Sequence, residues 1–139
     1  MSNQPLIGKE KIIDYLRLIC NELQPIVEVS DLYPAEDDIV AYGIYVGDVD
    51  YETREALQLG IQRCGSIYTA IDSFNILFVS YQNDPQREIV EDAINNLASN
   101  AEFFDGYHEV TFTEDSVLGN SKSKRITYTF NLKRLNFND

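Results

Sequence analysis

The stretch FNILFVSYQNDPQREIVEDAINNLASN, residues 74–100, decides the fold because it joins a buried strand to an amphipathic helix. Over residues 74–81 both alternating sets of side chains are apolar, which is typical of a central strand covered on both faces. One cover is a helix, and a neighbouring subunit is a candidate for the other. Asp84 is a candidate N-cap and Pro85 suits a first helical position, so residues 85–100 are predicted to be helical. The expected buried stripe is Ile89, Val90, Ala93, Ile94 and Leu97.

A second helix is predicted over residues 9–23. Its apolar residues recur at one-face helical spacing, and they are Ile12, Ile13, Leu16, Ile19, Cys20 and Leu23. Pro25 stops the pattern. Both helices have narrow apolar stripes and polar opposite faces. Each helix is therefore expected to lie on a sheet, with its other side in water or against a partner.

Three further strands are indicated by alternation or β propensity. Residues 126–133 alternate apolar and polar side chains, as in a half-buried strand. Residues 39–46 also suggest a strand, in which Gly43 marks a bulge or a close backbone approach. Residues 108–113 suggest a shorter one. Residues 54–64 fit both a strand and a helical stripe, and we favour the strand.

These elements predict one α+β domain over residues 1–139, because this length matches one ordinary core. The expected architecture is a mostly antiparallel sheet of four to five strands packed with two helices, in the order α-β-β-β-α-β-β. Residues 115–124, with Gly119 and Asn120, are expected to form a long polar loop between the last two strands. Loops of this length are often functional.

Charge is strongly segregated along the chain. Residues 21–53 hold nine carboxylates and no Lys or Arg, whereas residues 117–138 hold five Lys or Arg and no acid. One negative and one positive surface are expected, an arrangement that lets identical subunits meet head to tail. The candidate subunit-interface residues are Glu36, Asp37, Asp38, Asp48, Asp50, Lys122, Lys124 and Arg125. The alternative is that both runs are solvated faces.

Composition disfavours several classes of protein. A formal net charge of −12 opposes binding to nucleic acid backbones or anionic membranes, although the basic C-terminal stretch leaves a small opening for either. Two cysteines are too few for a disulfide scaffold, and the start of the chain lacks a secretory signal, so a reducing cytoplasm is expected. No apolar run approaches the roughly 20 residues that span a bilayer.

No motif predicts catalysis, a cofactor or a metal. Asp48, Asp50 and Glu52 have the spacing that opens an EF-hand loop, but Thr53 stands where that loop needs Gly. His108 is the only histidine and has no marked partner. Cys20 is expected to behave as a small buried hydrophobe, and Cys64 lacks a companion motif. We therefore expect a protein that is not an enzyme.

The order of elements across nearly the whole chain resembles that of small tail-terminator, tail-completion and head–tail connector proteins of tailed bacteriophages. The resemblance lies in the opening helix 9–23, the strand 74–81 that leads through Asn83-Asp84-Pro85 into helix 85–100, and the closing hairpin. It implies a homo-oligomeric ring between portal and tail tube, assembled in the host cytoplasm and present in the virion. It also implies portal, connector and tail proteins as partners, and an acidic channel through which double-stranded DNA slides without sequence-specific binding.

Two other classes of function stay open. A free-standing ferredoxin-like module that binds a ligand or peptide would show the same elements, and an enzyme of unfamiliar design would need a pocket of convergent titratable groups. For the assembly function, the loop 115–124 is expected to dock on an adjacent subunit or on the next ring of the assembly through Lys122, Lys124 and Arg125.

Overall fold

The protein has the predicted α+β class, with two helices and a six-stranded, mostly antiparallel sheet in its described parts. The computed structural model describes residues 7–35, 41–55, 66–81, 83–100, 103–118 and 123–138. The elements are α1 Lys9–Cys20, β1 Val29–Ser30, β2 Gly43–Val46, β3 Asp50–Glu55, β4 Ser66–Tyr81, α2 Arg87–Leu97, β5 Glu109–Leu118 and β6 Ser123–Asn138.

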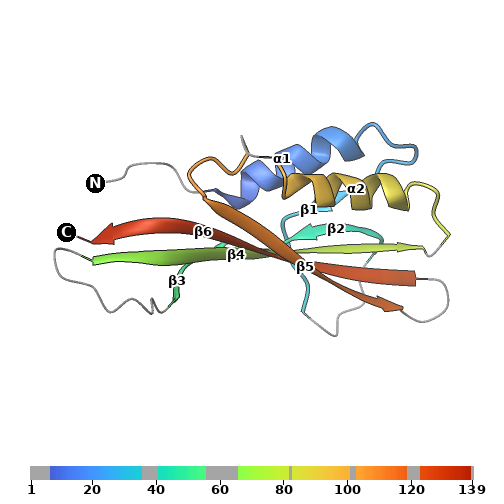
Figure 1. The fold of residues 1–139 in the computed structure, drawn as a ribbon. Helices are drawn as coiled ribbons and strands as arrows, with labels where there is room; N and C mark the ends of the chain where they lie inside the picture. Colours follow the sequence, from blue (N-terminus) through green and yellow to red (C-terminus); the bar gives the residue numbers. More distant parts are fainter. Residues whose placement is uncertain are drawn as a thin grey trace.

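The two longest strands, β4 and β6, form the centre of the sheet. They pair antiparallel along their whole length, from Ser66 opposite Asn138 to Tyr81 opposite Ser123. The strand order is β1-β2-β4-β6-β5, and β3 pairs with β4 outside this path. Only the β1–β2 pairing among these is parallel. Figure 1 shows both helices lying on one face of this sheet.

The core lies between the helices and that face. Phe74 of β4 stands opposite Phe130 of β6, which stands opposite Phe112 of β5. The Phe74 and Phe130 rings are stacked with centroids 4.8 Å apart, and Phe112 continues the row at 5.2 Å from Phe130. Ile12 and Leu16 of α1 are fully buried members of the same core. The amphipathic stripes of the helices therefore bury against a row of aromatic rings that crosses three strands.

The opposite face of the sheet, which we call the open face, is covered in part by the chain itself. Leu77 and Val79 point to this face and are 2% and 4% exposed, so the predicted burial on both sides of this strand is confirmed for them, whereas Tyr81 of the same set is 51% exposed. Leu77 shares a hollow with Tyr33, Pro34 and Ala35. A Cβ atom added to Gly47 would lie 3.4 Å from the Tyr33 ring. Residues 33–35 of the same chain thus lie over Leu77. The sequence analysis had considered a neighbouring subunit as the cover of this face.

Both helices are shorter than predicted. The first helix was predicted to end at residue 23, but α1 ends at Cys20, where the Glu22 and Leu23 amides donate to Ile19 and Cys20 in tighter three-residue turns. The second was predicted to start at residue 85, but α2 begins at Arg87. Its C-terminal end, predicted at residue 100, is Leu97, and three-residue turns follow.

Four of the five residues of the predicted stripe of α2 are buried. They are Val90, Ala93, Ile94 and Leu97. The prediction for Ile89 is wrong, because this side chain is 48% exposed. Ile89 lies at the margin of a narrow apolar stripe, where a small rotation of the helix decides between core and solvent.

The predicted loop 115–124 is also wrong in its extent. Asp115–Leu118 continue β5, and Ser123 and Lys124 already belong to β6, with Leu118 opposite Lys124. Polar residues are tolerated here because β5 is an edge strand of an antiparallel sheet, with one face solvated. Residues 119–122 lie outside the described residues.

The other predicted strands are observed at the expected places, but their first or last residues differ from the prediction. The strand expected at 39–46 is observed as Gly43–Val46, and the one expected at 108–113 extends to Leu118. Arg54 and Glu55 are strand residues, as favoured, but they end β3, and residues 56–65 lie outside the described residues. The two-residue β1 was not predicted, so the observed order is α-β-β-β-β-α-β-β.

The core position of α2 can be tested with two isoleucines on the same helix. Ile94→Ala should lower the free energy of unfolding by about 2–5 kcal/mol, because Ile94 is fully buried and its truncation leaves a cavity. Ile89→Ala is the matched control and should change it by about 0.5 kcal/mol or less. Urea unfolding followed by circular dichroism measures both. Similar losses for the two variants would show that the orientation of α2 is wrong.

Candidate functional site

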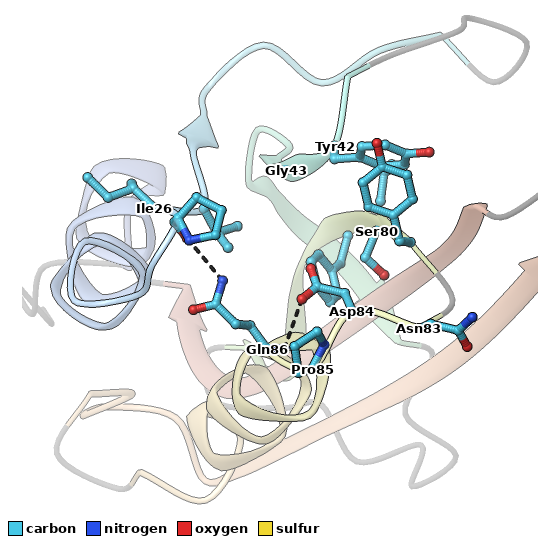
Figure 2. Close-up of a pocket in the computed structure, with 13 residues that line it drawn as sticks. Ile26, Tyr42, Gly43, Ser80, Asn83, Asp84, Pro85 and Gln86 are labelled. Atoms are coloured by element: carbon cyan, nitrogen blue, oxygen red, sulfur yellow. Dashed lines mark hydrogen bonds between the residues drawn. The ribbon is translucent and has the colours of Figure 1, made fainter.

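A pocket of about 580 Å³, which we call the end pocket, opens where β4 leads into α2 (Figure 2). Three parts of the chain line it: residues 25–27 after α1, Tyr42 and Gly43 at the start of β2, and residues 78–81 and 83–86. Its apolar lining residues include Pro25, Ile26, Val27, Phe78, Val79 and Pro85. The volume and the lining match those of pockets that hold small organic molecules.

The wall between α1 and α2 is held by the side-chain amide of Gln86. Its Oε1 accepts a hydrogen bond from the Gln24 backbone N–H at 2.8 Å, and its Nε2 donates to the Pro25 backbone carbonyl at 3.0 Å. Asp84 Oδ1 in turn accepts from the Gln86 backbone amide at 2.9 Å. Asp84 was predicted to cap the helix directly, but it forms this turn before α2 instead. The start of α2 and the segment after α1 are therefore fixed to each other.

Gly43 lets the segment before β1 approach β2. Its φ angle is +155°, and a Cβ atom at this position would lie 2.9 Å from the Glu28 carbonyl oxygen. The same oxygen accepts a hydrogen bond of 2.8 Å from the Ile44 amide. A larger residue would push this carbonyl away from the sheet. The close backbone approach predicted at Gly43 is thus confirmed.

Ser80 is one of the residues around the end pocket, and its hydroxyl is buried beneath the pocket surface. The residue is 3% exposed, and its Oγ has no hydrogen-bond partner in the described structure. Figure 2 shows the Ser80 side chain between Tyr42 and the turn at Asp84 and Pro85. A buried hydroxyl normally has a partner, because leaving it without one is unfavourable. The Ser80 Oγ has almost no accessible surface, so a molecule in the pocket does not reach it.

Two tyrosines form the rim on the β2 side. The rings of Tyr42 and Tyr81 have centroids 4.0 Å apart, and the side chains are 43% and 51% exposed. Partial burial raises the pKa of the Tyr42 phenol, and the neighbouring Tyr81 raises it further. The raised pKa keeps the Tyr42 phenol uncharged at neutral pH. The two rings present aromatic faces to the solvent beside an apolar cavity.

A second hollow, the open-face groove, lies on the other side of the sheet. It has a volume of about 670 Å³, and its lining includes Tyr33, Asp115, Val117, Arg125 and Thr127. Burial raises the pKa of the Tyr33 phenol, while a hydrogen bond with Thr127 and the Arg125 charge oppose this rise. Arg125 is therefore close to Tyr33. Unlike the end pocket, this groove holds charges of both signs.

The structure separates the predicted interface residues into two groups. Asp48 and Asp50 are exposed around the connection from β2 to β3, on one side of the central β4. Lys124 and Arg125 lie at the start of β6, on the other side of β4. The remaining four, Glu36, Asp37, Asp38 and Lys122, lie outside the described residues. Among the four candidates that the structure describes, the acidic and basic residues are thus not brought together within one chain.

Part of the basic stretch is engaged inside the chain. Lys133 Nζ lies 3.4 Å from Glu109 Oε2 of the neighbouring β5. Arg134 is 9% exposed and pairs with Asp72, which is fully buried. At least two of the five positive charges that suggested a basic surface, Lys133 and Arg134, therefore have acidic partners in the folded subunit. On the acidic side, Asp48 is paired with Lys9 at 2.7 Å.

The pair of Asp72 and Arg134 is the centre of a buried polar network. Arg134 Nε and Nη2 donate to the two carboxylate oxygens of Asp72 at 2.9 and 3.3 Å. The Tyr107 hydroxyl donates to Asp72 Oδ2 at 2.6 Å and accepts from the Ile7 amide at 3.4 Å. Tyr51 donates to the Ile7 carbonyl. Burial, and then the hydrogen bond to Asp72, raise the pKa of Tyr107.

This network joins the segment before α1 to β3, β4, β6 and the turn before β5. A carboxylate saturated by a bidentate guanidinium and a tyrosine has little capacity left for chemistry. We therefore interpret the network as structural.

The remaining candidates for chemistry show no catalytic arrangement. Cys20 is buried as predicted, and burial raises the pKa of its thiol to about 11, so the thiol is protonated at neutral pH. His108 is exposed just before β5. Cys64 lies outside the described residues. In the described parts of the chain, no three His, Cys, Asp or Glu side chains gather as metal ligands would.

None of the helices in the described ranges combines the length and apolar character that crossing a bilayer requires.

The end pocket was missed by the sequence analysis. Its two walls were noticed separately, as a proline that stops one helix and a turn that starts another. No local pattern shows that these places meet in space, because Gln86 joins them across more than 60 residues. Ser80 carried no signal either, since a serine at the end of an apolar strand usually marks only its end.

The buried network predicts a large difference between two charge-removing substitutions. Asp72→Asn should lower the free energy of unfolding by about 3–5 kcal/mol, because it leaves the Arg134 guanidinium buried without an anion. Asp48→Asn is the matched control and should cost about 1 kcal/mol or less, since the Asp48 side chain is 90% exposed. Urea titration at neutral pH measures both values. A loss in Asp72→Asn no larger than that of the control contradicts the role of this network.

Comparison with known proteins adds no relative to this description. No model of a protein family matches the chain, and no curated protein matches it in sequence.

Proposed function

We propose that this chain is a non-enzymatic structural subunit that joins copies of itself head to tail. The observation that carries the proposal is the position of the charged residues relative to β4. Exposed Asp31, Asp48 and Asp50 belong to the flank of the sheet that holds β1, β2 and β3. Lys124 and Arg125 belong to the opposite flank, where β6 and β5 lie. A heterologous contact needs two unlike and complementary surfaces of this kind.

The open-face groove adds apolar contact area beside Arg125. Tyr33 and Val117 line this groove and are 37% and 55% exposed. A contact that covers these side chains buries apolar surface next to a charge, which is the usual composition of a protein interface. Arg125 lies beside Tyr33 and shares the groove with Asp115 of its own chain, and the acidic flank of a neighbouring copy would add a further acidic contact to this end of β6.

The assembly that best fits the resemblance is a closed ring of a bacteriophage head–tail connector or tail terminator. Heterologous contacts close into a ring when the rotation between neighbours permits it. The net charge of −12 supports this function, because an acidic lining repels the phosphates of DNA that passes through the ring. The partners of such a ring are portal, connector and tail proteins, and its location is the virion.

A second candidate function is a free-standing ligand-binding module. The end pocket favours it, since a preformed apolar cavity of this size is suited to a small ligand. Such a module has no need to form a ring. The two functions therefore differ in the oligomeric state that they require.

The assembly proposal can be tested with two basic residues on the same strand. Arg125→Ser should weaken self-association by about five- to tenfold, because it removes a charge at the hairpin end of β6, which we assign to the contact. Lys133→Ser changes the net charge equally but lies in the second half of β6, beside Glu109 of β5 and away from the proposed contact. It should therefore change self-association by about twofold or less. Sedimentation velocity over a concentration series measures both.

The salt dependence of self-association provides a second test in the same experiment. Raising ionic strength from about 0.05 to 0.5 M should weaken the wild-type association, since salt screens charges near the surface. Arg125→Ser should show a smaller salt effect than Lys133→Ser. Equal behaviour of the two variants, or association that is indifferent to salt, contradicts the proposed charged contact.

A further inference from the structure

The outer edge of β5 offers backbone groups that no described part of the chain uses. β5 is the last strand in the strand order, and among the described strands it pairs with β6 alone. In an antiparallel pair, every second residue turns its N–H and C=O away from the neighbouring strand. Over the ten residues of β5 this leaves a long row of donors and acceptors. Such an edge is a template for an extended peptide.

The edge is also open and regular. Glu109, Thr111 and residues 113–117 are exposed, so the strand is accessible from solvent along most of its length. Two features that often close an edge, a proline and a β-bulge, are absent from β5. Its pairing with β6 keeps one register from Glu109 to Leu118. An incoming strand therefore meets an uninterrupted edge.

Phe112 indicates what one face of the incoming strand carries. Its ring ends the aromatic row that begins with Phe74 and Phe130, and it is only partly buried. Val110, on the same face of β5, is likewise partly buried against the core. A strand added beside β5 would place one side chain directly opposite Phe112, where cross-strand pairs pack. An aromatic or large apolar side chain there would extend the row and cover the exposed part of Phe112.

The acids of β5 indicate the charge of the incoming strand. β5 contains Glu109, Glu114 and Asp115 and no Lys or Arg. Glu109 lies beside Lys133 of β6, whereas Glu114 and Asp115 stand opposite uncharged residues of that strand. Opposite charges on paired strands stabilise the pairing, and like charges weaken it. Lysine or arginine opposite Glu114 and Asp115 is therefore the complementary choice.

The same charges disfavour a second copy of the chain as the occupant. A second β5 would bring three more acids to the edge, and β3 carries three acids and one arginine. Four of the five basic residues in the stretch 117–138 lie in β6. That strand already pairs with β4 on one side and β5 on the other. In its described parts, a second copy thus has no basic strand edge to offer.

We propose that the outer edge of β5 binds an extended, basic segment of another protein and adds it to the sheet as a further strand. An aromatic or large apolar side chain of that segment faces Phe112, and lysine or arginine faces Glu114 and Asp115. This site goes beyond the contact proposed for self-association, which rests on Arg125 and the opposite acidic flank.

The test uses the full-length protein and the fluorescein-labelled peptide TKKTFTVKT. When it pairs antiparallel with β5, its phenylalanine faces Phe112, its two adjacent lysines face Glu114 and Asp115, and its valine faces Val110. Fluorescence anisotropy should show saturable binding of one peptide per chain. A peptide with glutamate in place of every lysine should bind at least about tenfold more weakly, because like charges then face each other.

Two double variants test the position of the peptide. Glu114→Gln with Asp115→Asn should weaken binding about fivefold at low salt, because two cross-strand ion pairs are lost. Asp14→Asn with Glu22→Gln is the matched control, since it removes the same charge at exposed positions in and after α1. It should change affinity by about twofold or less. All four substitutions keep the shape of the side chain, and thermal unfolding of both variants should stay near that of wild type.

Two N-methylated analogues of the peptide test the backbone pairing itself. One carries methyl groups on every second backbone nitrogen, and the other carries them on the nitrogens in between. Only one of these sets faces β5, because alternate N–H groups of a strand point to opposite sides. One analogue should therefore bind at least about tenfold more weakly than the other. Binding of the unmodified peptide should also slow amide hydrogen exchange over residues 109–118.

The proposal is overturned by any of three results. These are no saturable binding of the basic peptide, equal affinities of the two double variants, or equal affinities of the two N-methylated analogues. The first result would mean that the acids of β5 only guard the edge against pairing. Dissociation of an oligomer by the peptide would also overturn it, because the edge would then belong to a contact between copies. Sedimentation velocity without peptide tests self-association separately, so failure of one proposal does not imply failure of the other.

Discussion

The antiparallel pairing of β4 with β6 is the constraint on which the rest of the structure depends. These two sixteen-residue strands run side by side over their full length, and β2, β3 and β5 all pair with one of them. Their register places Phe74 against Phe130 at the centre of the core. A slip by one residue would turn every side chain of one strand to the other face, so a buried face on both strands fixes the register.

The same ladder positions two different parts of the molecule. Near its middle, Asp72 of β4 and Arg134 of β6 bind each other and draw in Tyr107, which in turn contacts the segment before α1. At one end, β4 leads into the turn before α2 and ends at the end pocket. The Asp72 carboxylate is saturated with hydrogen bonds, whereas the end pocket is an open hollow. This contrast is why we assign a structural role to the buried network and treat the end pocket as the candidate ligand site.

Much of the fold could be predicted because it follows from local patterns. The alternation in β6 and the apolar run in β4 are strong signals, and both helices have clear stripes. The ends of elements were less accurate, since Ile89 and the turn at Asp84 depend on how α2 packs. The strand residues of Asp115–Leu118 looked like loop because an edge strand in water needs few apolar side chains. Longer-range pairing with β6 determines their structure.

The candidate sites were less predictable than the fold. Charge segregation suggested a subunit interface, but sequence alone did not show that Arg134 is buried with Asp72 or that Lys133 lies beside Glu109. The end pocket depends on Gln24 and Gln86 meeting in space, which no local spacing records. Tertiary contacts between distant residues thus explain why part of the basic stretch is paired inside the chain. They also explain why the end pocket was not predicted.

Self-association through two unlike flanks of the sheet is the central claim, and the mass of the protein in solution tests it most directly. Multi-angle light scattering at low salt, over about a hundredfold range of concentration, reports this mass without a label. A closed heterologous ring predicts a mass that rises with concentration and then stays at one fixed multiple of the monomer. A monomer mass at every concentration, or a mass that grows without limit, would contradict the account.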